Sequence, residues 1–174
     1  MSEMLTVTSL PPAARFSVRG GAGAIALIGA ALDLPFPRLA CRSVVAGATA
    51  ALWLGPDEWL LIREGGNAEE MMAAMTAGLG NEPASLVEIS NRQVGIEVTG
   101  SGAADALNAF NPLDLAETAF SVGTCTRTIF GKAEIILWRT GARTFRIEVW
   151  CSFAAYVLAC LEEAGREYGG GVAA

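Results

Sequence analysis

The chain repeats itself once, and this internal repeat limits the folds open to it more than any other feature of the sequence. Landmarks of the first half recur in the second half in the same order, and their offset drifts upward by only a few residues. Such a pattern indicates duplication with small loop insertions, although a composition rich in alanine and leucine also produces some matches by chance. The matching strings are Val18-Arg19-Gly20 with Val98-Thr99-Gly100, Leu32-Asp33-Leu34 with Leu113-Asp114-Leu115, and Leu52-Trp53 before Trp59 with Leu137-Trp138 before Phe145.

The first copy alternates between the periodicities of strands and helices. A Gly-Pro-Asp turn at residues 55–57 separates two hydrophobic runs, which predicts a β-hairpin. Asn67 is placed to cap a helix that has acidic residues in its first turn and Gly78 and Gly80 at its end. The expected strands are residues 15–19, 49–54, 58–63 and 85–89, and the expected helices are residues 23–31 and 68–78.

The second copy contains the clearest strand, residues 93–99, in which apolar and polar side chains alternate. A helix at 102–110, two or three strands within 125–149 and a helix at 152–164 follow, and residues 167–174 are expected to be a flexible tail. The order strand, helix, strand, strand, helix, strand is that of the ferredoxin-like βαββαβ unit. We therefore predict an α+β fold, a single domain of two pseudo-repeats, about 14–90 and 91–166, that share an antiparallel sheet.

The chain is short of polar residues, since 52% of it is hydrophobic and 17% charged, and its mean hydropathy is +0.42. Large exposed apolar patches mark contacts with other proteins, whereas abundant alanine and glycine offer an alternative explanation of this index. The longest apolar stretch, residues 22–32, is shorter than the roughly 18 residues that a membrane span requires. A secretory leader would need positive charge before an apolar stretch, but the first charged residue is Glu3, so we predict a cytoplasmic protein.

The charged and metal-binding residues exclude several functions. The net charge is −6 and the twelve cationic residues, eleven arginines and Lys132, are scattered along the chain, so nucleic-acid binding is not expected. Histidine is absent, which removes the usual general base and the commonest metal ligand. The cysteines lack metal-ligand spacing and are expected to be buried thiols; they are Cys41, Cys125, Cys151 and Cys160.

A glycine-rich helix start raises the possibility of dinucleotide binding. Gly21-x-Gly23 follows a predicted strand and opens a predicted helix, but the motif continues with Ala26 and lacks the later acidic residue. A similar string, Gly100-Ser101-Gly102-Ala103, recurs in the second copy. A feature present in both copies is better explained by the way in which this fold joins a strand to a helix.

Two polar segments and the tryptophans are further candidates. Within the tetrapeptide at residues 90–93, Asn91 and Arg92 are suited to bind an anion, while Ser and Asn are also ordinary turn formers. Lys132, next to a predicted hairpin, is either an electrostatic anchor or one more exposed lysine. Tryptophans on strands are expected in the core, with one or two at an interface; they are Trp53, Trp59, Trp138 and Trp150.

Taken together, several strings make the chain resemble the gamma-subunit family of heterotetrameric sarcosine oxidases. They occur in order over nearly the whole chain: Leu54-Gly55-Pro56-Asp57-Glu58-Trp59-Leu60-Leu61, Ser90-Asn91-Arg92-Gln93-Val94-Gly95-Ile96-Glu97-Val98-Thr99-Gly100, Asn111-Pro112-Leu113-Asp114-Leu115, Cys125-Thr126-Arg127 and Gly131-Lys132-Ala133-Glu134. That family is similar to the folate-binding aminomethyltransferase fold. This chain has Glu88 where that fold has an aspartate, which weakens the expectation of direct folate binding.

The resemblance implies a complex with alpha, beta and delta subunits that oxidises sarcosine to glycine, hydrogen peroxide and either formaldehyde or methylene-tetrahydrofolate. It places FAD, FMN, NAD, zinc and tetrahydrofolate in the partner subunits, with no catalytic, cofactor-binding or metal-binding residue in this chain. The isolated chain is a possible homodimer. Candidate interface or family-motif residues are Trp59, Asn91, Arg92, Gln93, Asn111, Pro112, Asp114, Arg127 and Lys132.

Three functional hypotheses follow. The leading one is a non-catalytic subunit that docks on the large alpha chain. The second is a residual tetrahydrofolate pocket between the two halves, with Arg92 or Lys132 as partners for the glutamyl carboxylates. The third is an independent nucleotide-dependent enzyme, which the glycine-rich helix start alone suggests.

Overall fold

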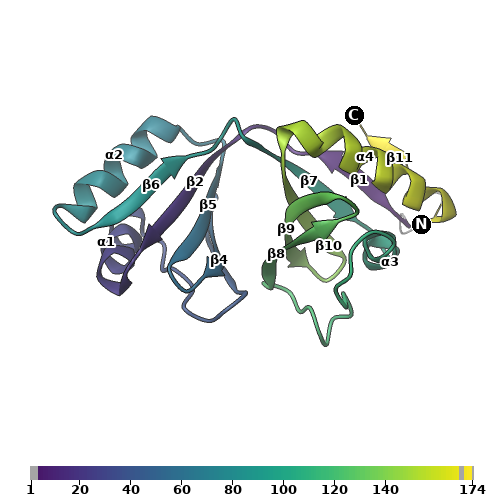
Figure 1. The fold of residues 1–174 in the computed structure, drawn as a ribbon, viewed down its shortest axis with the longest axis horizontal. Coiled ribbons are helices and arrows are strands. Elements are labelled where there is room, and N and C mark those ends of the chain that lie inside the picture. Colours follow the sequence, from purple (N-terminus) through teal and green to yellow (C-terminus); the bar gives the residue numbers. More distant parts are fainter. Residues whose placement is uncertain (1–3, 169–170, 174) are drawn as a thin grey trace. The chain divides into compact units, whose positions relative to one another are not determined.

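The computed structural model describes residues 4–168 and 171–173, which pack as two compact units (Figure 1). The first, here called the inserted unit, is Pro12–Ser90; the second, the split unit, consists of Met1–Pro11 and Asn91–Ala174. The inserted unit therefore ends at the predicted boundary between the two repeats. The α+β class is confirmed, because each unit combines helices with its own sheet of mostly antiparallel strands.

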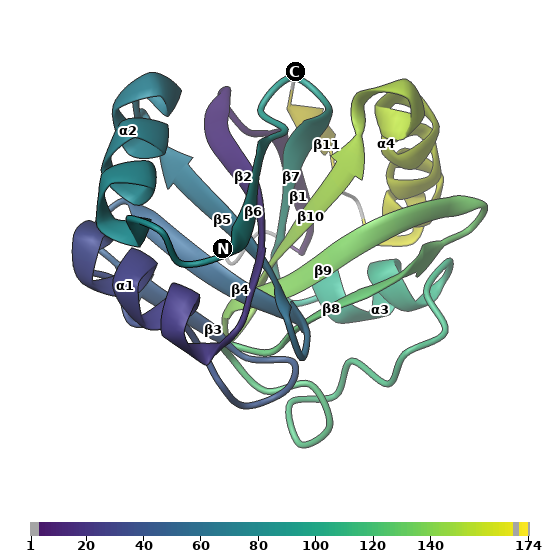
Figure 2. The same cartoon turned by 60° about the vertical axis from the view of Figure 1, so that its left-hand side comes forward.

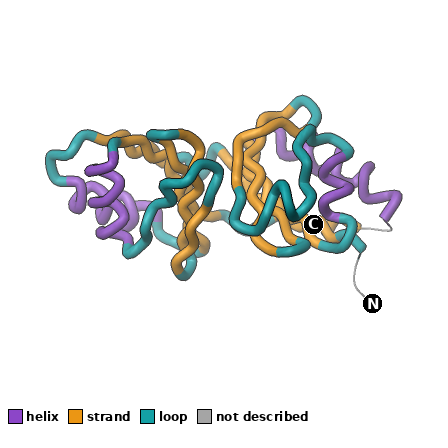
Figure 3. Tube along the Cα trace, turned by 90° about the horizontal axis from the view of Figure 1, so that it is seen from below, coloured by secondary structure: helices purple, strands orange, loops and turns teal. Residues whose placement is uncertain are grey.

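The inserted unit has the ferredoxin-like strand order with one added edge strand. Its sheet runs β3-β4-β5-β2-β6, and every neighbouring pair is antiparallel. Both helices lie together on one side of the strands (Figures 2 and 3). The elements are β2 (Ala13–Gly20), α1 (Ala22–Leu32), β3 (Ser43–Ala46), β4 (Thr49–Gly55), β5 (Glu58–Glu64), α2 (Ala68–Leu79) and β6 (Ala84–Glu88).

The core of the inserted unit lies between the sheet and these helices. Alternate residues of each strand face the helices, so Phe16 and Leu61 are fully buried there against Ile28 of α1 and Met75 of α2. The helices approach closely, since a Cβ on Gly78 would lie only 2.6 Å from Ala31 Cβ. A side chain at this position of α2 would therefore push the two helices apart.

The predicted cap of α2 is confirmed. The Asn67 side chain accepts a hydrogen bond of 2.9 Å from the Glu69 backbone N–H, and Gly80, with φ of 56°, ends the helix. Asn67→Ala is expected to lower the free energy of unfolding of the inserted unit by about 1 kcal/mol, whereas Asn67→Gly lowers it by only a few tenths. Urea denaturation followed by circular dichroism measures both, and an equal loss for the two variants would contradict a capping role.

The split unit repeats the architecture, but its fourth strand comes from the start of the chain. Its sheet runs β11-β1-β7-β10-β9-β8, and β1 lies antiparallel to β7 as β6 lies antiparallel to β2. The elements are β1 (Thr6–Ser9), β7 (Gln93–Thr99), α3 (Ala103–Asn108), β8 (Cys125–Phe130), β9 (Ala133–Gly141), β10 (Thr144–Trp150), α4 (Cys151–Gly165), the 3₁₀ turn η1 (Arg166–Tyr168) and β11 (Gly171–Ala173).

Two expectations about the sheets need correction. The repeats do not share one sheet, because β1 gives the second repeat the strand that it lacks and each repeat then completes its own sheet. The tail predicted at 167–174 is structured where the structure describes it: Tyr168 ends η1, and Gly171–Ala173 pair in parallel with residues 6–8 of β1. The outer edge of β1 offers backbone groups that require partners. Residues 169, 170 and 174 lie outside the described part.

The strand pairing defines the correspondence between the repeats and corrects one match by a single residue. Trp59 pairs with Trp53 across β4 and β5, and its counterpart Phe145 pairs with Arg139 across β9 and β10. Trp53 therefore corresponds to Arg139, and Trp138 corresponds to Leu52. Because a shift of one residue exchanges the two faces of a strand, Trp53 belongs to the helix-facing side and Trp138 to the opposite side.

The core of the split unit lies beneath α3 and α4. Val98, Leu137 and Ile147 of the sheet are buried there together with Leu107 of α3 and Val157 of α4. Within the described residues, no helix combines the length and apolar character needed to cross a membrane.

Candidate functional site

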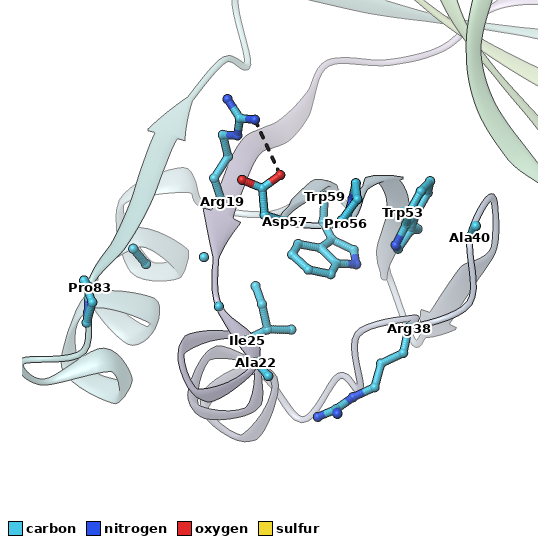
Figure 4. A pocket seen from close by; sticks show the side chains of 13 residues that line it. Arg19, Ala22, Ile25, Arg38, Ala40, Trp53, Pro56, Asp57, Trp59 and Pro83 are labelled. Carbon is cyan, nitrogen blue, oxygen red and sulfur yellow. Dashed lines mark ion pairs between the residues drawn. The ribbon is translucent and has the colours of Figure 1, made fainter.

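A pocket of about 790 Å³ opens in the inserted unit where β2 ends and α1 begins (Figure 4). The β4–β5 turn, the loop at residues 33–42 and the start of β6 complete its walls. Its volume lies in the range of small-molecule and anchor sites, and most of its lining is apolar. We call it the tryptophan pocket and define it by Arg19, Ile25, Arg38, Trp53, Asp57 and Trp59.

The two tryptophans reach the pocket from neighbouring strands. Trp59 is 5% exposed, its indole N–H donates a 2.8 Å hydrogen bond to the Pro37 carbonyl, and its ring meets Phe36 edge-on at 5.9 Å. Trp53, directly across from it on β4, is only partly buried. Trp59 is therefore held rigidly, and the partly exposed Trp53 forms a wall of the pocket.

The charges of the pocket stand at its rim. An Arg19 guanidinium nitrogen lies 3.5 Å from Asp57 Oδ1, and both side chains are more than half exposed, so this ion pair contributes at most about 1 kcal/mol. The Asp57 carbonyl accepts a hydrogen bond from the Gly20 N–H, which ties the β4–β5 turn to the end of β2. Arg38 is exposed on the loop below (Figure 4). An aromatic floor with cations at its edge can bind a flat group that carries negative charge.

A second cavity of about 370 Å³ lies beside the first, between α1 and the loop that follows it. It shares Ile25 and Arg38 with the tryptophan pocket. Among residues 4–168 and 171–173, no group of three or more His, Cys, Asp or Glu side chains is arranged to hold a metal ion.

Of the nine candidate interface or family-motif residues, only Trp59 lines the tryptophan pocket, and Gly21 of the glycine-rich helix start and Trp53 line it as well. Arg92 lies in the split unit, where its guanidinium stands 5.2 Å from the centre of the Trp150 ring and its carbonyl accepts a hydrogen bond from the Cys151 N–H. The Lys132 backbone N–H donates to the Tyr156 hydroxyl at 3.2 Å. Both predicted cations therefore flank the start of α4, where the N-cap residue Trp150 is exposed together with Phe153 and Tyr156 of the first turns.

The neighbours of Arg92 differ in burial. Asn91 is exposed, whereas Gln93 is 5% exposed and pairs with Trp150 at the start of β7. Arg92 and Lys132 line neither of the two cavities described above.

Of the remaining predicted residues, Asn111 and Asp114 hold the long loop of the split unit, residues 109–124. Asn111 is buried and donates a 2.8 Å hydrogen bond to the Ile129 carbonyl, while its side-chain oxygen accepts one from the Leu113 N–H. Asp114 accepts a hydrogen bond from the Ala116 N–H, and Pro112 is exposed. Arg127 lies 3.8 Å from Glu134 in an exposed ion pair. These contacts explain the residues structurally, without a ligand.

Sequence reasoning missed most of the pocket. Arg19 and Arg38 are separated along the chain and carry no motif, and Asp57 was noted only in the Gly-Pro-Asp turn and a family string. The strand tryptophans were expected in the core, with one or two at an interface, and nothing distinguished Trp53 among them. The pairing of β4 with β5 could have identified Trp53 as a pocket residue, because it places Trp53 opposite Trp59 on the same face of the sheet.

A family model and curated relatives match most of the chain. The model of the family described as "Sarcosine oxidase, gamma subunit family" matches residues 19–167. The chain is 34% identical over 151 residues to the sarcosine oxidase gamma subunit of Corynebacterium sp. (strain P-1), covering 85% of this chain and 72% of that one. It is 34% identical over 155 residues to that of Arthrobacter sp., covering 87% and 74%.

Two solved structures have the same fold as this chain. A chain of heterotetrameric sarcosine oxidase from Corynebacterium sp. U-96 matches with a TM-score of 0.90 and 27% identity, covering 100% of this chain and 90% of that one. The glycine cleavage system aminomethyltransferase T from Bartonella henselae matches with a TM-score of 0.72 over 98% of this chain and 48% of that one, at 14% identity, which shows the fold alone. The aminomethyltransferase-like fold is thereby confirmed, and the chain belongs to the sarcosine oxidase gamma-subunit family.

Proposed function

We propose that this chain is the non-catalytic gamma subunit of a heterotetrameric sarcosine oxidase and that it stabilises the complex by docking on the larger subunits. The observation that carries the proposal is the structural match over the whole chain to a chain of the heterotetrameric enzyme from Corynebacterium sp. U-96. The complex would oxidise sarcosine to glycine and hydrogen peroxide, with formaldehyde or methylene-tetrahydrofolate as the one-carbon product.

The chemistry of the chain supports a role in assembly. The sequence contains no histidine and a single lysine, so the common proton-transfer groups near neutral pH are missing. Its surface exposes several large apolar side chains, among them Leu39 at 75%, Met4 at 51% and Ile129 at 52%. In this proposal FAD, FMN, NAD, zinc and tetrahydrofolate are held by the alpha, beta and delta subunits in the cytoplasm.

Co-expression with the alpha, beta and delta chains of the same organism tests the proposal. We expect the four chains to elute together in size-exclusion chromatography, because the apolar surface of this chain is then covered. Omission of this chain is expected to reduce the yield of assembled, sarcosine-oxidising complex. A stable and fully active complex of the other three chains would contradict a stabilising role.

The tetrahydrofolate alternative stays a prediction. It invoked Arg92 or Lys132, and these residues border the exposed start of α4 instead of a cavity described above. Isothermal titration calorimetry of the isolated chain with tetrahydrofolate tests it, and the absence of heat at high micromolar ligand would exclude it.

A further inference from the structure

We infer that the tryptophan pocket receives an aromatic side chain of a partner subunit, with an acidic residue of the same partner segment at Arg38. The inference rests on the proposed function, since it names the surface through which a docking subunit would dock. It is argued from a comparison of the two repeats, one of which fills this place with its own side chain.

In the split unit, the position of Trp59 is occupied by Phe145. Both residues pair with the corresponding valine of the first strand, Val18 for Trp59 and Val98 for Phe145. The Phe120 ring stacks on Phe145 with a centroid distance of 6.5 Å and an interplanar angle of 27°. Phe120 is only 5% exposed, so the chain itself supplies the aromatic cover at this place.

An arginine completes the cover in the split unit. The Arg139 guanidinium stands 5.0 Å from the centre of the Phe145 ring. Its Nη1 donates hydrogen bonds to the carbonyls of Leu115 and Phe120, at 3.2 and 2.9 Å. Arg139 therefore fixes the loop that carries Phe120 over the sheet.

The inserted unit covers Trp59 differently. Its loop between helix and edge strand spans residues 33–42, whereas the loop of the split unit spans residues 109–124. Trp53 takes the place of Arg139, and Phe36 meets Trp59 only edge-on. The result is the cavity of about 790 Å³. A space that one repeat fills with a phenyl ring has the shape and apolar walls that a ring from another chain requires.

The charges favour an acidic partner. The lining carries two positive charges, Arg19 and Arg38, and one negative charge, Asp57. The pocket is therefore positive, although the whole chain carries a net charge of −6. Asp57 already faces Arg19 at 3.5 Å. The structure assigns Arg38 neither an ion pair nor a hydrogen bond with another described residue, and its guanidinium is exposed at the rim. A carboxylate beside the incoming ring would pair with it.

A polypeptide fits the surroundings better than a small metabolite. The pocket is larger than one ring, and its rim continues into Ala40 and into Leu39, which is 75% exposed. Tryptophan and arginine are enriched where protein interfaces concentrate their binding energy. A segment with one aromatic anchor and flanking apolar contacts would cover Leu39 together with the pocket.

Hydroxyl-radical footprinting with mass spectrometry tests the inference on the co-expressed complex and on the isolated chain. We expect Trp53 to be oxidised several-fold more slowly in the complex, because the partner ring covers its exposed edge. Protection of Trp150 alone, with Trp53 oxidised equally in both samples, would place the partner on the split unit and overturn the inference. Protection of Trp53 that is already present in the isolated chain and is lost after unfolding and refolding would indicate a small-molecule occupant, and would overturn it as well.

Variants give an independent measurement. Trp53→Ala and Arg38→Glu are each expected to weaken association with the partner chains about tenfold or more, as measured by surface plasmon resonance. Arg63→Glu makes the same charge change at the other end of β5, away from the pocket, and is expected to leave association unchanged. Circular dichroism of each isolated variant verifies that it folds.

The outcomes separate the two proposals. If no complex forms even with the unmodified chain, the proposed function fails and the inference fails with it. If the complex forms but Trp53→Ala and Arg38→Glu bind like Arg63→Glu, the proposed function stands and the inference alone is wrong.

Discussion

Glu148→Ala is expected to lower the free energy of unfolding of the split unit by about 3–5 kcal/mol. Arg146 Nε donates a 2.7 Å hydrogen bond to Glu148 Oε1, and the two side chains are only 9% and 1% exposed. Removal of the carboxylate takes away the charge that a buried guanidinium contacts at 2.7 Å, which costs far more than the loss of an exposed pair. Urea unfolding monitored by tryptophan fluorescence measures the change.

The chain offers a matched control for this prediction. Glu134 faces Arg127 at 3.8 Å in the same unit, but these side chains are 62% and 39% exposed. Glu134→Ala is therefore expected to change stability by less than about 1 kcal/mol. The double variant Arg146→Met with Glu148→Leu should recover most of the stability, because no buried charge remains. Equal effects of Glu148→Ala and Glu134→Ala would contradict the assignment of a buried pair.

Phe120→Ala is expected to lower the stability of the split unit by about 3–5 kcal/mol. The ring is buried and stacks on Phe145, and the loop that carries it is held by two hydrogen bonds from Arg139. Truncation removes apolar burial and leaves a void above Phe145. The midpoint of urea unfolding should fall accordingly.

A second substitution in the same loop provides the comparison. Val122 is 47% exposed, so Val122→Ala is expected to change stability by less than about 0.5 kcal/mol. The void left by Phe120→Ala should admit a small aromatic molecule, since apolar cavities of this kind bind benzene. Raised stability of Phe120→Ala, but not of Val122→Ala, in benzene-saturated buffer would support the correspondence with the tryptophan pocket. A loss in Phe120→Ala no larger than that in Val122→Ala would contradict it.

Local patterns predicted the regular elements well. The strand expected at 93–99 has the bounds of β7, Gln93–Thr99, because strict alternation of apolar and polar side chains marks a strand with one buried face. The hairpin of β4 and β5 and the cap at Asn67 were found for similar reasons, since turn and cap residues act over a few positions.

Long-range pairing could not be predicted in the same way. Strand β1 has four residues, and its partner β7 begins at Gln93, far along the chain. A short segment acquires its strand character from such a partner and leaves little trace in its own sequence. The separate sheets and the pairing of β11 follow from β1, so one missed strand explains both corrections.

The pocket was missed for a related reason. Trp53 has the periodicity of a core residue, and its exposure depends on the loop at residues 33–42 being too short to cover it. The family strings instead drew attention to Asn111, Asp114 and Arg127, whose contacts stabilise the loop and strands of the split unit. A residue can belong to a family motif because the fold requires it, and a motif alone therefore does not locate a binding site.

The origin of β1 has a consequence for how the polypeptide is made. A ribosome that has released residues 1–90 has delivered every strand and helix of the inserted unit, together with a strand whose neighbour is not yet synthesised. The inserted unit can therefore fold during translation, while β1 must wait for β7. During that interval, residues 6–9 lack the strand with which they pair in the folded unit, so they are open to mispairing and a chaperone could usefully shield them.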